Sequence, residues 1–477
     1  MLRKTILLLI LVVILVYSNS FNNGFVLDDE VLVTNNHLIR SLDSLPQIFN
    51  SKLYQALEMY RPLQVLSYCF DYKIWGLSPF GFHLGNVFLH ILNSILVYLL
   101  FCLISTAAIA LPIALLFAVH PINTSVVSYI SARADLLVTF FMLLSIICFG
   151  KFIRLKSLKW YFLSLLSAFV ALFCRENSLT LFLFIILIGY NLDPKRKIIR
   201  YVIPFLLLDL FYIVFRLGFL GNSNLGFSVS VISLPFQVIN FLNISFRYLY
   251  LLIFPFGLYM FRSTPFIVNF FNFLVIIIVI FTFLCCYFLY RLRKKRMFLF
   301  GVLWFLFGLF PVYLCFGRYF WLKQAIMAES WLYLPSIGVF VLFTLIKNKF
   351  AKLGNILLIL VVVFYGFLTW RNNTLWKDNI TAYKNILEHL PGRTPVRKNL
   401  IKEYLLLGFY NDAWLEIKKF GGDYPESSDR YALQGDYYYA INNISQAIEN
   451  YKISLRLNRY NLEVSEKLKK LERKNAK

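Results

Sequence analysis

Three adjacent carboxylates follow the first apolar run of the chain, which covers residues 5–16. They are Asp28, Asp29 and Glu30. Carboxylates next to apolar membrane are costly unless they are paired, bound to a metal or functional. Partial burial and a like-charged neighbour would raise one pKa, so that the carboxylate could act as a general base on a hydroxyl. We therefore take Asp28 and Asp29 as candidate catalytic residues, with a solvated acidic loop as the alternative.

Charged and polar side chains recur at the ends of later apolar runs. Each of them alone could simply reach the membrane interface, but five such clusters on one side favour a shared site. Arginines beside carboxylates suit a lipid-linked phosphate, because a guanidinium group binds phosphate oxygens through two hydrogen bonds. The candidate binding residues are Arg61, His83, Arg133, Asp135, Arg175, Glu176, Glu329 and Tyr333.

Motifs of several other enzyme classes are missing from the sequence. It has no phosphate-binding glycine loop, no zincin His-Glu pair and no nucleophile elbow. His83, His90 and His120 do not share a metal-ligand spacing, so no metal site is predicted. The seven cysteines lie mostly in apolar segments and predict no disulfide framework.

The elements that must position these residues are membrane helices. Of the 477 residues 59% are hydrophobic and 15% are charged, whereas a soluble domain is about half apolar and a quarter charged. The apolar residues form runs of roughly 17–25, the length of a membrane-spanning helix, and helices satisfy their own backbone hydrogen bonds in lipid. The net charge of +24 lies largely in short loops such as 195–197 and 291–296. Such loops indicate membrane orientation and not nucleic-acid binding.

Charge distribution also predicts the topology. Residues 1–16 read as a retained signal anchor with a cytoplasmic N-terminus, so that 19–85 form an outer loop. We expect about eleven spans within residues 1–370. The proline-interrupted stretch 228–266 is expected to be a re-entrant hairpin or an outer interfacial helix. The C-terminal domain, residues 371–477, is then extracytoplasmic.

The C-terminal domain carries a repeat of 34 residues. Asn379, Ala413 and Ala447 align, as do Tyr404 and Tyr438. This is the period of the tetratricopeptide repeat (TPR), in which small residues let two helices pack closely. The predicted fold is therefore all-α: a polytopic membrane bundle followed by a short TPR-like helical domain.

The ordered motifs resemble those of a known family. Besides Asp28-Asp29 they are Tyr-Arg-Pro-Leu at 60–63, Gly-Phe-His-Leu at 81–84, His-Pro-Ile at 120–122, Arg-Ala-Asp at 133–135, Arg-Glu at 175–176 and Tyr-Leu-Pro-Ser at 333–336. In this order they resemble the transmembrane and TPR-containing O-mannosyltransferases and their bacterial relatives. The resemblance implies a GT-C fold and a polyprenyl-phosphate sugar donor, often mannose, used on the outer or lumenal face. Carried over, Asp28 or Asp29 would be the base, and Arg133, Arg175 and Glu176 would line the donor site.

These observations together predict a glycosyltransferase that moves a sugar from a lipid-linked donor to a hydroxyl of a protein or glycan. The repeats would hold the acceptor, and an arginine or a bound divalent cation would stabilise the leaving phosphate. No nucleic-acid partner is expected. The alternatives are a transporter or flippase of lipid-linked sugars, with Asp209 and Arg216 as its deep charges, and a TPR membrane scaffold. The short repeat array favours a bacterial inner membrane over the endoplasmic reticulum.

Overall fold

The protein consists of two helical units in a computed structural model that describes residues 2–50, 59–194, 197–219, 233–269, 272–292, 295–314, 324–349 and 351–475. Unit 1 is Met1–Trp376 and unit 2 is Lys377–Lys477. The prediction of an all-α bundle is confirmed. The division falls after Trp376 and not after residue 370, because the last helix of unit 1 continues to Asn373.

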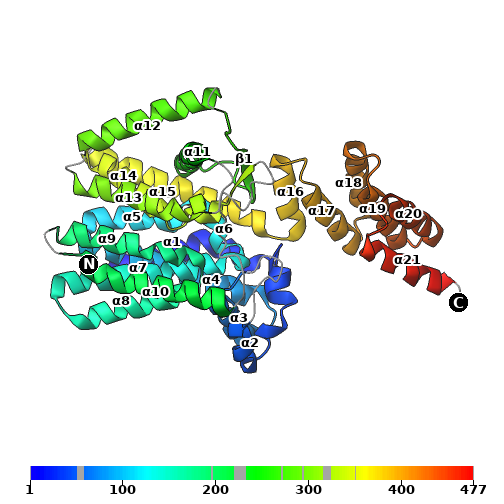
Figure 1. Cartoon of the computed structure of the whole chain (residues 1–477), viewed down its shortest axis with the longest axis horizontal. Coiled ribbons are helices and arrows are strands. Elements are labelled where there is room, and N and C mark those ends of the chain that lie inside the picture. Colours follow the sequence, from blue (N-terminus) through cyan, green and yellow to red (C-terminus); the bar gives the residue numbers. More distant parts are fainter. Residues whose placement is uncertain are drawn as a thin grey trace. The chain divides into compact units, whose positions relative to one another are not determined.

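Unit 1 is a bundle of long apolar helices with two short strands. Figure 1 shows that α2 and α3 lie toward the end of this unit opposite the N-terminus. The antiparallel strands are β1 (Arg262–Pro265) and β2 (Gln324–Met327). The helices are α1 (Leu2–Tyr17), α2 (Leu45–Asn50), α3 (Pro62–Trp75), α4 (Pro79–Ile104), α5 (Ala107–Val119), α6 (Thr124–Val127), α7 (Arg133–Leu155), α8 (Leu158–Leu172), α9 (Leu181–Leu192), α10 (Ile199–Phe219), α11 (Leu234–Ile253), α12 (Phe273–Leu292), α13 (Arg296–Leu314), α14 (Ser336–Lys349) and α15 (Ala351–Asn373).

Many of these helices are candidates for crossing a membrane. Six in the described ranges are long and apolar enough, or up to seven if the bent pair Ala107–Val119 and Pro121–Val127 is one span. Shorter apolar helices accompany them, namely Leu158–Leu172, Glu176–Leu192, Phe273–Leu284, Arg296–Val312 and Ser336–Leu345. Because length and composition alone define these candidates, the expected number of about eleven spans stays a prediction.

The proline-rich stretch 228–266 does not form the hairpin that was one expectation for it. Its described part contains one continuous helix, α11, followed by strand β1. Pro235 occupies the first turn of α11, where its missing N–H costs nothing. Pro255 follows the helix and Pro265 ends the strand. The prolines therefore bound these elements and do not interrupt them.

Helix α7 is the most deeply buried of the candidate spans, since 72% of its most apolar stretch is buried inside the protein. It packs against α4, α8 and α9. A short turn joins α7 to α8, so the two helices run in opposite directions and the end of α8 lies beside the start of α7. The first turn of α7 carries Arg133 and Asp135. Both charges are thus fixed on the central helix at one end of the bundle.

Unit 2 repeats a pair of helices every 34 residues. It contains α16 (Asn379–His389), α17 (Thr394–Leu406), α18 (Tyr410–Asp423), α19 (Ser428–Ala440), α20 (Ile444–Leu457) and α21 (Leu462–Asn475). The starts of α17, α19 and α21 are 34 residues apart, as are those of α18 and α20. A Cβ on Gly435 would lie 2.5 Å from the ring of Tyr451. Glycine therefore permits the close packing of α19 on α20.

Candidate active site

The two adjacent aspartates of the acidic turn have opposite environments. Asp29 is fully buried, whereas Asp28 is exposed. The Asp29 carboxylate accepts hydrogen bonds from the backbone N–H of Val26 (2.9 Å) and of Ser131 (2.8 Å), and also from the Ser131 hydroxyl. Leu27, between Val26 and Asp28, has a φ of +53°, a strained value for a non-glycine residue. The turn thus points one carboxylate inward and presents the other outward.

Burial raises the pKa of Asp29 to about 7, although its three hydrogen bonds act in the opposite direction. The backbone N–H of Asp28 donates to the Tyr129 hydroxyl at 3.3 Å. Ser131 and Tyr129 both belong to the segment that leads into α7. This segment therefore holds the acidic turn against the central helix of the bundle.

Arg133 is buried and surrounded by protein groups. Its Nε donates to the Asn86 side chain at 2.7 Å and its Nη2 to the Phe82 carbonyl at 2.6 Å. Its Nη1 forms an ion pair with Asp71, and the guanidinium group lies 4.7 Å from the centre of the Tyr68 ring. Arg133 thus joins α3, α4 and α7, and a donor phosphate could reach it only by displacing these groups.

A second group of charges lies beside the first turn of α7. Arg175 forms an ion pair with Asp135. The next residue, Glu176, is placed between Arg216 at 3.0 Å and Arg61 at 3.4 Å. We call these five residues the arginine cluster. With three guanidinium groups and two carboxylates, it carries one excess positive charge.

The arginine cluster is partly accessible and incompletely satisfied. The side chains of Arg61, Arg175 and Glu176 are 12–14% exposed. The Nε atom of Arg61 is buried and has no hydrogen-bond partner in the described part of the chain. Because an anion at this position would balance the excess charge and accept from such donors, the cluster can bind a phosphate group.

The arginine cluster also includes Arg216, one of the two deep charges named for the transporter alternative. Arg216 contacts Glu176 and the Tyr212 hydroxyl (3.4 Å). Asp209 lies two helical turns away on α10, whereas Glu176 begins the neighbouring segment that leads into α9. Arg216 thus pairs with Glu176 from another segment, and the described contacts do not pair it with Asp209.

Tyr333 belongs to a buried network that connects α4 to the segment before α14. Its hydroxyl lies 2.6 Å from His90 Nδ1 and accepts from the Asn93 side chain at 3.2 Å. His90 Nε2 lies 3.1 Å from the Ala118 carbonyl, which can only accept. We therefore assign the proton to Nε2, so that Nδ1 accepts from Tyr333.

The other two predicted residues, His83 and Glu329, have different surroundings. His83 is buried on α4 next to the backbone of Asn23 and Gly24, just before the acidic turn. Glu329 accepts hydrogen bonds from Arg262 (2.7 Å) and from the backbone N–H of Tyr259 (2.9 Å). Glu329 therefore anchors the β1–β2 ribbon, and its contacts are separate from the arginine cluster.

A small cavity lies beside the Asp135–Arg175 ion pair, between α7, α13 and the segments that lead into α9 and α14. Polar groups of Asp135, Asn177, Thr180 and Ser330 line one part of it. Apolar side chains complete it, and they come from Val138, Met142, Pro311, Trp331, Leu334 and Pro335. Tyr333 and Thr139 also contribute. The cavity has room for about one water molecule.

The end of α15 is bonded to the segments that hold the acidic turn. The Asn373 amide donates to the Val16 carbonyl (2.9 Å) and to the Asn19 side chain (2.8 Å), and its oxygen accepts from the Ser128 hydroxyl (2.8 Å). Its backbone carbonyl accepts from Asn23 at 2.9 Å. A few residues later, Trp376 stacks on Tyr129 with ring centres 4.9 Å apart. Asn373 thus links the last helix of unit 1 to the segment that follows its first helix.

The structure therefore brings most of the predicted site residues to one end of the bundle and adds others. Asp29, Arg133, Asp135, Arg175, Glu176 and Arg61 surround the first turn of α7. Sequence reasoning missed the roles of Ser131, Asp71 and Asn373, which are ordinary polar residues without a chemical motif. No three His, Cys, Asp or Glu side chains converge on a metal position within the described ranges.

Fold and site define a polytopic α-helical membrane protein with an acidic turn and an arginine cluster at one end of its bundle. The chain is similar to proteins named O-mannosyl-transferases. One of them, Protein O-mannosyl-transferase F38B6.6 of Caenorhabditis elegans, is 25% identical over 450 residues, which cover 87% of this chain and 62% of that protein. The chain thus spans about three fifths of this relative's length.

Other relatives match over shorter regions. The human Protein O-mannosyl-transferase TMTC4 is 29% identical over 198 residues, covering 35% of this chain and 27% of that protein. The Drosophila melanogaster Protein O-mannosyl-transferase Tmtc1 is 30% identical over 172 residues, covering 34% and 20%. No family model matches the chain, and no solved structure matches it significantly. The resemblance predicted from the ordered motifs is confirmed by these names.

Proposed function

We propose that this chain is a glycosyltransferase that moves a sugar from a polyprenyl-phosphate donor to a hydroxyl group of a protein acceptor. The observation that carries the proposal is that an outward-facing carboxylate, Asp28, and an arginine cluster of excess positive charge lie at the same end of the bundle, near the start of α7. The names of the relatives support mannose as the sugar.

In the proposed reaction, Asp28 is the general base. Its exposed carboxylate accepts the proton of the acceptor hydroxyl, and the hydroxyl oxygen bonds to the anomeric carbon of the sugar. The bond from that carbon to the phosphate oxygen breaks, and the lipid phosphate leaves with the electron pair. Attack from the face opposite the phosphate inverts the anomeric configuration.

Asp29 has a positioning role in this proposal. Both of its carboxylate oxygens accept hydrogen bonds from within the protein, so they are not directed toward an acceptor. Its bond to Val26 closes the turn across the strained Leu27, and its bonds to Ser131 hold the turn against the segment that leads into α7. Removal of Asp29 would let the turn relax and would move Asp28 away from the acceptor hydroxyl.

The arginine cluster would bind the donor phosphate. Arg61 and Arg175 are its more accessible cations, and Arg61 has a free Nε donor among the described residues. They would stabilise the charge that develops on the leaving phosphate. A bound divalent cation is the alternative source of this charge, and chelation by EDTA distinguishes the two.

The direct test uses protein purified in proteoliposomes with a radiolabelled polyprenyl-phosphate mannose and a protein acceptor. Asp28→Asn should lower the transfer rate about 100-fold or more, as expected for loss of a general base. Glu30→Gln, which alters another exposed acidic residue of the turn, is the matched control and should keep most of the rate. Full transfer by Asp28→Asn in a folded protein would refute the assignment of the base.

The proposed orientation follows from the charge distribution, and the proposed membrane from the short repeat array. We propose a bacterial inner membrane, with the endoplasmic reticulum as the alternative, a cytoplasmic N-terminus, and the active site and unit 2 on the extracytoplasmic side. Introduced cysteines test this topology with a membrane-impermeant maleimide. Lys418→Cys in unit 2 should react in intact cells, whereas Lys156→Cys, in the turn between α7 and α8, should react only after permeabilisation. Reaction of both or of neither in intact cells would contradict the topology.

A further inference from the structure

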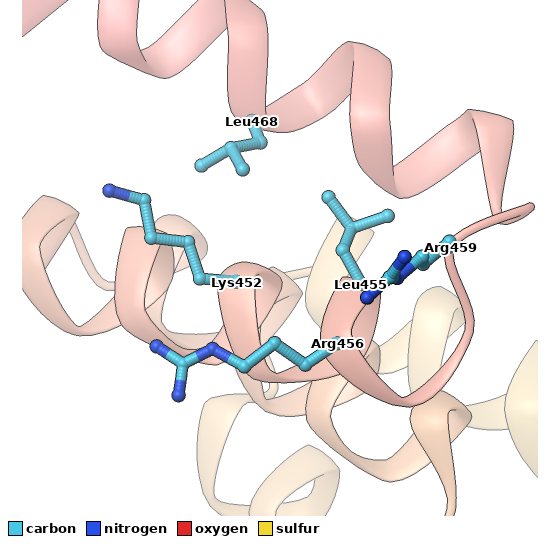
Figure 2. A pocket seen from close by; sticks show the side chains of 5 residues that line it. All are labelled: Lys452, Leu455, Arg456, Arg459 and Leu468. Atoms are coloured by element: carbon cyan, nitrogen blue, oxygen red, sulfur yellow. The ribbon is translucent and has the colours of Figure 1, made fainter.

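A recess opens in unit 2 between its last two helices (Figure 2). Helix α20 supplies Lys452, Leu455 and Arg456, the following turn supplies Arg459, and α21 supplies Leu468. In Figure 2 the two leucines lie between the helices and the cationic side chains extend around them. The recess thus combines an apolar floor with a rim on which every charge is positive.

Two of the three cations are available to a ligand. Lys452 forms an exposed ion pair with Glu472 at 3.2 Å. Arg456 and Arg459 are exposed and form no ion pair with an acidic residue that the structure describes. An exposed ion pair contributes little to stability and exchanges readily. A negatively charged partner could therefore engage both arginines and compete with Glu472 for Lys452.

Both leucines at the floor are partly buried against the core of the last repeat, which includes Tyr451 and Val464. Three large apolar side chains are exposed next to the recess, along the α20–α21 turn. They are Leu457 (50%), Tyr460 (91%) and Leu462 (76%). Exposed apolar side chains gathered beside a charged rim are typical of an interaction surface.

We propose that this recess binds an acidic polypeptide segment of another protein. Its carboxylates pair with Arg456 and Arg459, and an apolar side chain between them enters the space above Leu455 and Leu468. Guanidinium groups favour carboxylates through paired hydrogen bonds. The leucines lie below the cations, so a side chain that projects from a peptide can reach them, whereas a flat lipid surface would contact mainly the rim. The proposal goes beyond the transfer reaction and does not depend on it.

The test uses the full-length protein in nanodiscs of phosphatidylcholine. The probe is a fluorescent peptide of about twelve residues in which aspartate and glutamate surround one leucine, and fluorescence anisotropy measures its binding. A peptide with asparagine and glutamine in their places is the matched probe. The acidic peptide should bind saturably, and the amide peptide should bind at least about tenfold more weakly.

Two double variants distinguish binding in this recess from attraction to the overall positive charge of the protein. Arg456→Glu with Arg459→Glu should weaken the acidic peptide at least about tenfold. Lys418→Glu with Lys419→Glu makes the same change of charge on α18 and should leave binding within about twofold. Leu455→Ala should weaken binding without changing the charge. All four altered charged residues are exposed, and unchanged thermal unfolding confirms the fold of each variant.

Three results would overturn the proposal. The first is equal binding of the acidic and amide peptides. The second is equal loss in both double variants, which would indicate net charge alone. The third is loss of peptide binding when phosphatidylglycerol is added to the discs, because the basic rim would then bind lipid instead. None of these measurements uses transfer activity, so their failure is distinguishable from failure of the proposed reaction.

Discussion

Asp29 should make the stability of the protein depend on pH in an unusual direction. Burial raises the pKa of this carboxyl from 3.8 to about 7. Between pH 5 and pH 8 the native carboxyl therefore changes from protonated to ionised, while the unfolded one is ionised throughout. The native state binds more protons at the lower pH, so the contribution of Asp29 to the free energy of unfolding falls as the pH rises.

The magnitude follows from the two pKa values. Integrated from pH 5 to pH 8, the difference in bound protons corresponds to a loss of about 2.5 kcal/mol. The side-chain amide of the variant Asp29→Asn cannot ionise. This amide also cannot accept all three hydrogen bonds that the carboxylate accepts, but that cost is the same at every pH. The stability of Asp29→Asn relative to the natural protein should therefore rise by about 2.5 kcal/mol across this range.

The measurement is chemical unfolding of both proteins in detergent micelles at pH 5 and pH 8. Asp28→Asn provides the matched control, because it removes the neighbouring carboxylate from an exposed position. Its relative stability should change by less than about 0.5 kcal/mol. A relative stability of Asp29→Asn that stays constant, or that falls as the pH rises, would refute the assignment of Asp29 as a buried carboxyl held by Ser131.

Three further predictions concern packing and ion pairs, each measured by unfolding under the same conditions. Asn373→Ala removes three side-chain hydrogen bonds and should cost about 3 kcal/mol; a cost below about 1 kcal/mol would contradict them. Arg216→Gln takes one of two cations away from the partly buried carboxylate of Glu176 and should cost about 2 kcal/mol, whereas an unchanged stability would show that the pair is not formed. Gly435→Ala places a Cβ 2.5 Å from the Tyr451 ring and should destabilise unit 2 by about 1–3 kcal/mol, and an unaltered unfolding of unit 2 would count against the close helix contact.

Much of the fold could be predicted because it depends on periodicity and apolar content. The 34-residue period locates most of the helix pairs of unit 2, since the starts of α17, α19 and α21 repeat at that interval, as do those of α18 and α20. The prolines near 235 and 255 were harder to interpret. Proline interrupts a helix or bounds it according to where the helix begins, and the sequence does not fix that position to within a turn.

The sequence located the candidate residues at the ends of apolar runs but did not indicate their pairings. Arg133 and Arg175 are both arginines at the ends of apolar runs, yet one is enclosed by Asn86 and Asp71 and the other joins the partly accessible cluster. Likewise, the sequence could not distinguish Asp28 from Asp29. The difference arises from Ser131, which lies about a hundred residues further along the chain. Such contacts depend on how distant helices pack, and this packing cannot be predicted from local residue types.

The bonds of Asn373 also determine when the site can be completed during synthesis. Its partners Val16 and Asn23 leave the ribosome some 350 residues earlier, so the acidic turn must wait for the last helix of unit 1 before it acquires its final support. Chains that are released or cleaved before residue 373 can insert most of their helices and still lack this anchor. A cell that makes such fragments would accumulate inserted bundles whose acidic turn lacks this support, whereas a chain ending just after Trp376 would retain the anchor.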